Sequence, residues 1–183
     1  MKKILLVALV LGIFLSFVSQ VLALTPKASP IPLPTPTPGK VEYFLVYPGI
    51  LPDHFLYSVK MVRDRVLTFL TVDPLKKAEL FLLFADKRLG AGKALIEGGK
   101  VDLGVSTLTK GEKYLEQAIN EERVANKAGK DTKGLLERLS QASLKHEEVL
   151  VDLSQKVTGS ARSIIDQILT YPRKGYTQLK SLI

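Results

Sequence analysis

The sequence predicts an all-α protein, an up-and-down bundle of four main helices with a shorter C-terminal helix. Within each main segment apolar residues recur at intervals of three and four, which is the spacing of one face of a helix. Asp-Pro and Gly-Gly pairs separate the segments, and such pairs are typical of helix starts and ends. Short connections favour antiparallel neighbours, so we expect residues 53–183 to form one bundle domain.

The first 23 residues have the pattern of a signal peptide. A basic start, Met1-Lys2-Lys3, precedes an apolar run from Ile4 to Val18, and Val21 and Ala23 are small or modest in size where a signal peptidase reads. The alternative is an uncleaved anchor from Ile4 to Leu24, which is long enough to cross a bilayer. The chain has no Cys, which excludes an anchor through a lipid-modified cysteine.

Residues 24–40 are expected to form a stiff spacer. Alternating proline fixes φ and favours an extended polyproline helix. The spacer would hold the domain away from a membrane or wall; alternatively it is only a leader that clears the export machinery. Residues 41–52 follow as an extended arm, because Val41 to Tyr47 is β-branched and aromatic and Pro48-Gly49 ends the run.

The first two helices are predicted from their caps and stripes. Asp53 is expected to cap the first helix, and Asp73 with Pro74 starts the second, since proline suits the first helical position. Gly98-Gly99 ends the second helix. Both apolar stripes are expected to face the core: Phe55, Val59, Val62, Val66 and Phe69, then Leu75, Ala78, Leu82, Ala85, Leu89, Gly92 and Ile96.

The third helix is expected to start near Asp102 and the fourth near Asp131. Gly104 and Gly111 lie on one face of the third helix, and each costs up to about 1 kcal/mol relative to Ala, which indicates close approach of another backbone. A fifth, shorter helix is expected to end at Pro172, and the tail from Arg173 to Ile183 is expected either to add a last turn or to fray. The stripe of the fourth helix is Leu135, Leu139, Ala142, His146, Val149, Leu153 and Val157.

Composition limits the partners. Of 26 Lys and Arg residues, Lys2 and Lys3 lie in the signal segment, which leaves 24 against 18 Asp and Glu residues and a net charge of +6. This charge is spread along the chain, whereas nucleic-acid binders concentrate it on one face or run. We therefore expect no nucleic-acid partner, and at most weak attraction to anionic lipid or wall polymers.

No catalytic or cofactor site is expected. His54 is predicted to be an exposed polar residue, and His146 a neutral histidine hydrogen-bonded at the core edge, with a pH-sensitive or metal-binding histidine as the alternative. Bundle di-metal sites need Glu three residues before His, but Ser143 and Leu51 occupy those positions. The inward positions of the second and third helices are expected to be apolar or glycine.

Charged residues near the helix junctions are the candidates for interaction. We expect an interhelical ion network in which Lys and Arg of the first two helices pair with Asp64, Glu79 and Asp86; the alternative is a binding patch. The residues expected to fix the junctions or contribute to this patch are Asp53, Tyr57, Lys60, Arg63, Asp73, Glu79 and Arg88.

Three stretches of the chain carry a family resemblance: Tyr47 to Lys60, with Pro52-Asp53 and Leu56-Tyr57; Asp73-Pro74 to Leu80; and Ala85 to Leu89. They resemble an uncharacterised bacterial helical domain, a domain of unknown function found in envelope proteins, some of them shaped like anti-sigma factors. Phe55 departs from the pattern, which often has proline there. The resemblance implies a helical, extracytoplasmic and non-enzymatic protein, and it transfers no catalytic residue.

The sequence thus favours an exported, non-enzymatic helical domain that binds or scaffolds at the cell envelope, either secreted or anchored at the outer face of the cytoplasmic membrane. Its partner would be an unknown protein or envelope polymer, with possible membrane attachment through the N-terminal segment. The alternatives are a periplasmic-type helical chaperone or envelope stress sensor and, more remotely, an enzyme acting on wall or lipid.

Overall fold

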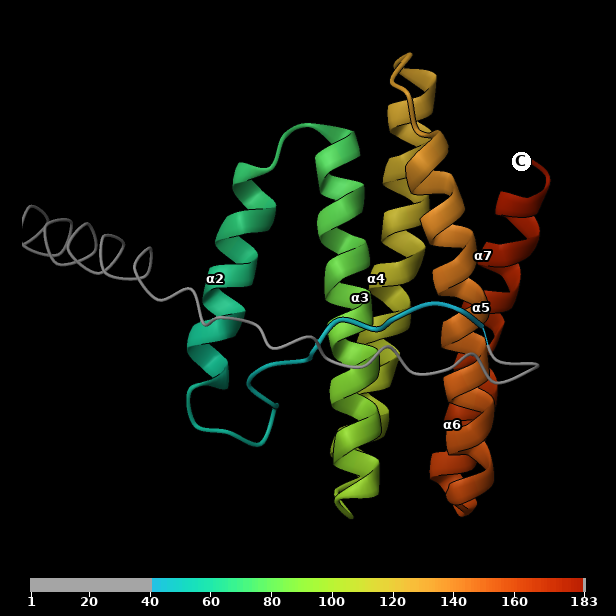
Figure 1. Cartoon of the computed structure of the whole chain (residues 1–183). Coiled ribbons are helices and arrows are strands. Elements are labelled where there is room, and N and C mark those ends of the chain that lie inside the picture. Colours follow the sequence, from blue (N-terminus) through green and yellow to red (C-terminus); the bar gives the residue numbers. More distant parts are fainter. Residues whose placement is uncertain (1–40, 183) are drawn as a thin grey trace, which may run out of the picture. The chain divides into compact units, whose positions relative to one another are not determined.

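The computed structural model describes residues 41–182, and within this range the chain is helical without strands. The predicted signal segment at 1–23 and the spacer at 24–40 lie outside the described residues. No helix in residues 41–182 combines the length and the apolar character needed to cross a membrane. The helices are α2 (Tyr57–Leu70), α3 (Pro74–Glu97), α4 (Val101–Lys127), α5 (Lys133–Lys156), α6 (Gly159–Ile168) and α7 (Thr170–Lys180) (Figure 1).

Asp73 caps α3, as predicted. Its Oδ1 accepts the backbone N–H of Leu75 at 2.9 Å and that of Lys76 at 3.1 Å, and Pro74 holds the first helical position. At the other end α3 stops at the predicted glycines. Gly99 has a φ of 81°, a conformation that glycine adopts without steric cost.

Glycines bring α3 and α4 close together. A Cβ added to Gly104 would lie 2.6 Å from Ile96 Cγ1 and 3.0 Å from the carbonyl oxygen of Gly92. One added to Gly111 would lie 3.4 Å from the carbonyl oxygen of Ala85. The prediction that Gly104 and Gly111 mark close approach of another backbone is confirmed.

The bundle core is formed by α3, α4, α5 and the consecutive helices α6 and α7. Its buried residues fall into two apolar clusters stacked along the helices. The seams predicted for residues 74–97 and 133–157 supply much of both clusters, and their expected burial is confirmed except at Leu75, which is half-buried. The first cluster includes Leu82, Leu115, Leu139 and Leu179, and the second includes Leu89, Leu108, Leu150 and Ile165.

The C-terminal part is longer than predicted. The expected fifth helix is α6, which ends at Ile168 rather than at Pro172, and a further helix, α7, runs from Thr170 to Lys180 after a turn at Leu169. Pro172 lies in the first turn of α7, where its missing N–H needs no intrahelical acceptor. Ile165 of α6 and Leu179 of α7 are fully buried, so the two helices together complete the bundle.

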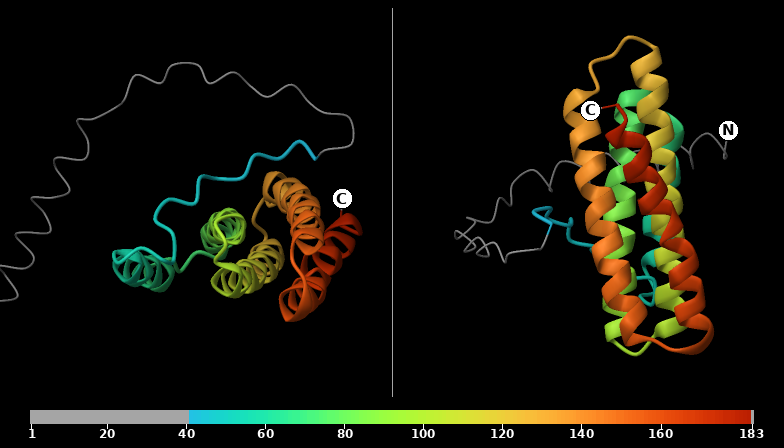
Figure 2. Two further views of the ribbon diagram at one scale, coloured as in Figure 1. Left: turned by 90° about the horizontal axis from the view of Figure 1, so that it is seen from below. Right: turned by 90° about the vertical axis from the view of Figure 1, so that its right-hand side faces the viewer.

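The first predicted helix also differs from expectation. It begins at Tyr57 and has no side-chain cap, so the prediction that Asp53 caps it is wrong. Asp53 Oδ2 instead accepts a hydrogen bond from Lys100 Nζ at 2.6 Å, and the residues between Asp53 and Tyr57 form turns. Figure 2 shows α2 (teal) beside α3, at the edge of the bundle rather than within it.

Candidate functional site

An apolar stripe on and just before α2 faces solvent. Phe55 is 83% exposed, Val62 is 59% exposed and Phe69 is 85% exposed. The prediction that this stripe faces the core is therefore wrong. In the described part of the chain nothing covers it, and it consists of Phe55, Val59, Val62, Val66 and Phe69.

The opposite face of α2 meets the bundle. Asp64 is only 2% exposed, and Met61 Sδ lies 3.4 Å from Arg88 Nη2 of α3. Periodicity predicts that a helix has an apolar face but does not say what covers that face. Here a contact with the buried Arg88 orients α2, and this orientation leaves the apolar stripe outside.

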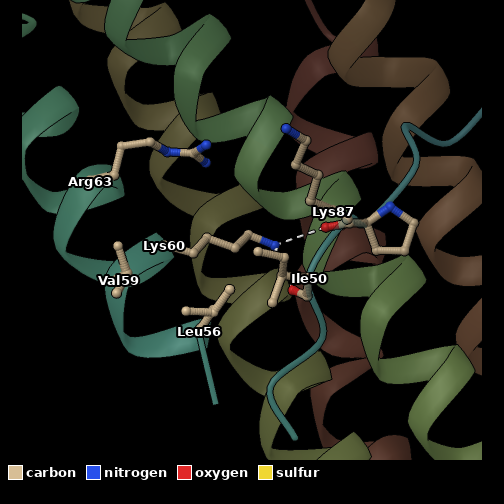
Figure 3. A pocket seen from close by; sticks show the side chains of 8 residues that line it. Ile50, Leu56, Val59, Lys60, Arg63 and Lys87 are labelled. Carbon is tan, nitrogen blue, oxygen red and sulfur yellow. Dashed lines mark hydrogen bonds between the residues drawn. The ribbon is translucent and has the colours of Figure 1, made fainter. Parts of the chain in front are cut away.

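A groove of about 360 Å³ runs between α2, α3 and the arm. Figure 3 shows side chains from α2 and α3 reaching into it from both sides. One part of its wall is apolar and the rest is positively charged. The apolar residues are Pro48, Ile50, Leu56 and Val59, and the basic residues are Lys60, Arg63 and Lys87.

Lys60 joins the arm to α2. Its Nζ donates to the carbonyl oxygen of Pro48 at 2.8 Å and to that of Ile50 at 3.0 Å (Figure 3). Burial lowers the pKa of Lys60; Asp64 opposes this shift, whereas Lys87 reinforces it. A negatively charged group placed in the groove would favour the charged form of Lys60 and bind these cations.

The charges that α2 exposes are all positive. At about 100° per residue, Arg63 and Arg65 lie about 80° to either side of the centre of the apolar stripe. Both arginines are exposed. Asp64 is the one acidic residue of α2; it is buried, and its Oδ1 accepts a hydrogen bond from Arg63 Nη2 at 2.8 Å. Arg65 thus borders the stripe with positive charge on one side, whereas Arg63 on the other side is paired with Asp64.

A second group of charged residues lies in the core, between the two apolar clusters. Nδ1 of the fully buried His146 lies 2.8 Å from Glu112 Oε1, and Nε2 lies 3.2 Å from Asp86 Oδ1. Burial alone lowers the pKa of His146, but Glu112 and Asp86 outweigh this effect and raise the pKa to about 9. The expected position at the core edge is wrong, because His146 is fully buried, and the raised pKa favours the charged form over the neutral form that the sequence predicts.

The arm is attached to this buried layer. Tyr43 Oη donates to Asp86 Oδ2 at 2.7 Å, and the backbone N–H of Val41 donates to Glu148 Oε2 at 2.9 Å. Burial, followed by the nearby Asp86, raises the pKa of Tyr43, which keeps its phenol a hydrogen-bond donor. The arm crosses from α5 over α3 to α2 (Figure 1).

The buried layer has the geometry of a structural network. Both ring nitrogens of His146 already face carboxyl groups, and the imidazole has no exposed surface. Residues 41–182 contain no group of three or more His, Asp or Glu side chains placed to hold a metal ion. The groove beside α2 is open to solvent and is the better candidate for binding.

The structure places four predicted residues on α2 or in the turns just before it. Lys60 and Arg63 line the groove, and half-buried Tyr57 starts the helix. Burial raises the pKa of Tyr57. Asp53 fixes the junction before α2 through Lys100, whose hydrogen bond lowers the pKa of Asp53.

The other predicted residues do not line the groove. Asp73 accepts from Lys130 Nζ at 2.6 Å, and this bond lowers the pKa of Asp73. Glu79 pairs with Arg138 of α5 at 2.6 Å. Arg88 is buried, and its guanidinium lies 4.3 Å from the ring centre of Tyr114.

The predicted ion network has different partners in the structure. Asp86 bonds to His146 and Tyr43 rather than to a basic residue of α2 or α3. The expectation of apolar or glycine residues at all inward positions of α3 and α4 is also wrong, because Asp86 and Glu112 are buried. One local signal could have revealed Glu112: it lies four residues after Leu108 and three before Leu115, both fully buried.

Comparison with known proteins gives a family without an assigned activity. Residues 49–160, which are more than half of the 183-residue chain, match a family described as a domain of unknown function (DUF5667). This match includes α2, the groove residues other than Pro48, and the buried residues Asp86, Glu112 and His146. No protein of curated function and no solved structure matches the chain. The chain therefore belongs to the DUF5667 family, a domain of unknown function.

Proposed function

We propose that this protein is an exported, non-enzymatic helical domain that acts by binding or scaffolding at the cell envelope. The observation that carries the proposal is the exposed apolar stripe on α2. A contiguous apolar patch on the surface of a folded protein marks an interaction site, because exposing apolar side chains to water is unfavourable. The predicted signal segment and spacer support a location outside the cytoplasm.

The positions and partners of the charged residues support binding rather than catalysis. The buried acids Asp86 and Glu112 bond to His146 inside the core, so they are not presented to a substrate. The groove presents cations and apolar side chains, which attract an anionic or amphipathic partner. General acid–base catalysis would instead need a titratable pair within reach of a bound substrate.

Site-specific photo-crosslinking in the producing cells tests this proposal. A photoreactive residue at Val62 should crosslink to an envelope component, and the same residue at Gln141, exposed on α5, should not. Fractionation should place the crosslinked product with the envelope. A cytoplasmic protein, or equal crosslinking at both positions, would contradict the proposal.

A chaperone that holds unfolded clients is a second candidate. It is supported by the apolar wall that Ile50 of the arm forms with Leu56 and Val59. A chaperone of this kind should suppress aggregation of a client protein at equimolar concentration. Val59→Glu should weaken that suppression, and no suppression by the unmodified protein would remove the candidate.

A further inference from the structure

We propose that α2 docks on a membrane surface that carries anionic headgroups, with its apolar stripe toward the acyl chains. The inference rests on the proposed envelope-binding function and names the chemistry of its partner. It concerns a peripheral contact of the folded domain and does not depend on whether the N-terminal segment is cleaved.

The shape of α2 suits a helix lying in the plane of a membrane interface. Its 14 residues span about 21 Å, and the stripe runs along the side that faces away from α3. Aromatic residues stand at both ends of the stripe, Phe55 and Phe69, and both are largely exposed. A helix of this kind binds by burying its apolar face at the boundary between headgroups and acyl chains.

The distribution of charge selects anionic lipid. Arg65 borders the stripe on one side and can extend to the headgroup level while the stripe enters the interface. On the other side Arg63 is paired with Asp64 at 2.8 Å, which partly neutralises its charge. Lys60 and Lys87 of the adjoining groove add positive charge on the Arg63 side. Asp64 is buried against the bundle, so α2 presents no acidic residue to repel an anionic headgroup.

A second copy of this chain is a poorer occupant of the stripe. A self-complementary contact would bring Arg65 of each α2 to the same interface, and α2 exposes no acid to pair with them. Like charges brought together at an interface oppose association. An acidic amphipathic helix of another protein has the required charge, and the test below separates it from lipid.

The test uses the full-length protein isolated from the producing cells. The chain lacks cysteine, so a single Val62→Cys variant can carry an environment-sensitive fluorophore on the stripe. A Gln141→Cys variant carries the same fluorophore on α5 as a control. Each protein is mixed with vesicles of phosphatidylglycerol and phosphatidylcholine in equal parts, or with vesicles of phosphatidylcholine alone.

We expect the fluorophore at position 62 to shift to the blue and to become protected from an aqueous quencher with the anionic vesicles. With phosphatidylcholine alone, at least ten times more lipid should be required to reach half of the maximal shift. It should also weaken at high salt, because salt screens surface charge. The fluorophore at position 141 should respond to neither vesicle, even where the N-terminal segment attaches the chain to both.

A matched pair of charge reversals tests the role of the arginine flank. Arg65→Glu should raise about tenfold the concentration of anionic lipid required for half of the shift at position 62. Lys113→Glu, which makes the same charge change at an exposed position of α4, should change it by less than twofold. Because both residues are exposed, the helical circular dichroism of both variants should match that of the unmodified protein.

Several results would overturn the inference. Equal responses to both vesicles would show hydrophobic attachment without charge recognition, and no response at position 62 would exclude docking through the stripe. A shift that appears without vesicles as protein concentration rises would identify a second copy as the occupant. A shift produced by lipid-free envelope protein, but not by vesicles, would identify a protein partner; envelope binding through α2 would then stand while the lipid assignment fails.

Discussion

His146 Nδ1 lies 2.8 Å from Glu112 Oε1 in a fully buried contact between α5 and α4. The other ring nitrogen faces Asp86 of α3, so one imidazole joins three helices of the bundle. A buried ion pair is costly to desolvate, but removing one partner is costlier because it leaves an unpaired charge in the core. The layer therefore ties α3, α4 and α5 into one arrangement at the level between the apolar clusters.

This contact predicts that the protein loses stability on the alkaline side of neutrality. The folded-state pKa of His146 is raised to about 9, above the unfolded value of about 6.5. The stabilisation is therefore complete below pH about 6.5 and is lost as the pH rises through about 9. We expect the free energy of unfolding, measured by denaturant titration, to fall by about 2–3 kcal/mol over this interval.

Two variants test whether this pH dependence comes from the buried layer. His54→Gln, which changes an exposed histidine, should leave the pH dependence of the free energy of unfolding unchanged. Glu112→Gln removes the carboxylate that raises the pKa of His146 most, and should lower the midpoint of the His146 titration observed by NMR. A stability that stays constant between pH 6.5 and 9 in the unmodified protein would contradict the assignment.

Tyr43→Phe should loosen the arm. The variant removes the 2.7 Å hydrogen bond to Asp86 and leaves a buried carboxyl oxygen without that donor, at a cost of about 1–3 kcal/mol. Amide hydrogen exchange in residues 41–50 should become faster, while exchange in α4 should change much less. Tyr47→Phe is the control, since Tyr47 is 80% exposed; equal effects of the two variants would argue against the tether.

Much of α3, α4 and α5 could be predicted from the sequence because the signals are local. Asp73 caps its own helix, Gly98 and Gly99 stop it, and seven-residue repeats identify the buried seam. The buried layer could not be predicted in this way. Asp86, Glu112 and His146 are far apart in the chain, and only the packing of three helices brings them to one level.

Gly104→Ala should destabilise the protein although alanine favours helix. A Cβ there would lie 2.6 Å from Ile96 Cγ1 and 3.0 Å from a backbone oxygen of Gly92. Separating α3 from α4 to relieve this contact should cost about 1–3 kcal/mol, measured by thermal or denaturant unfolding. Gly134→Ala in α5 is the matched control because its Cβ would meet nothing within 4 Å; it should be neutral or stabilise by up to about 1 kcal/mol.

The orientation of α2 differs from the one that the sequence predicts, and the physical cause of this difference can be tested. The 4-3-4-3 stripe has the spacing of a core face, but Val62 is 59% exposed whereas Leu82 of α3 is 5% exposed. Apolar residues have the same spacing on a face that packs inside the bundle and on a face that binds a partner outside the folded domain. Only the energetic effect of replacing these residues distinguishes the two situations.

Val62→Ser should therefore change the free energy of unfolding by less than about 0.5 kcal/mol, as for other surface substitutions. Leu82→Ala should cost about 2–5 kcal/mol, because it removes buried methyl groups and leaves a cavity. Denaturant titration of both variants in lipid-free buffer provides the comparison. A cost above about 2 kcal/mol for Val62→Ser would mean that the stripe of α2 is buried within the folded domain, and would leave no apolar surface there for a partner.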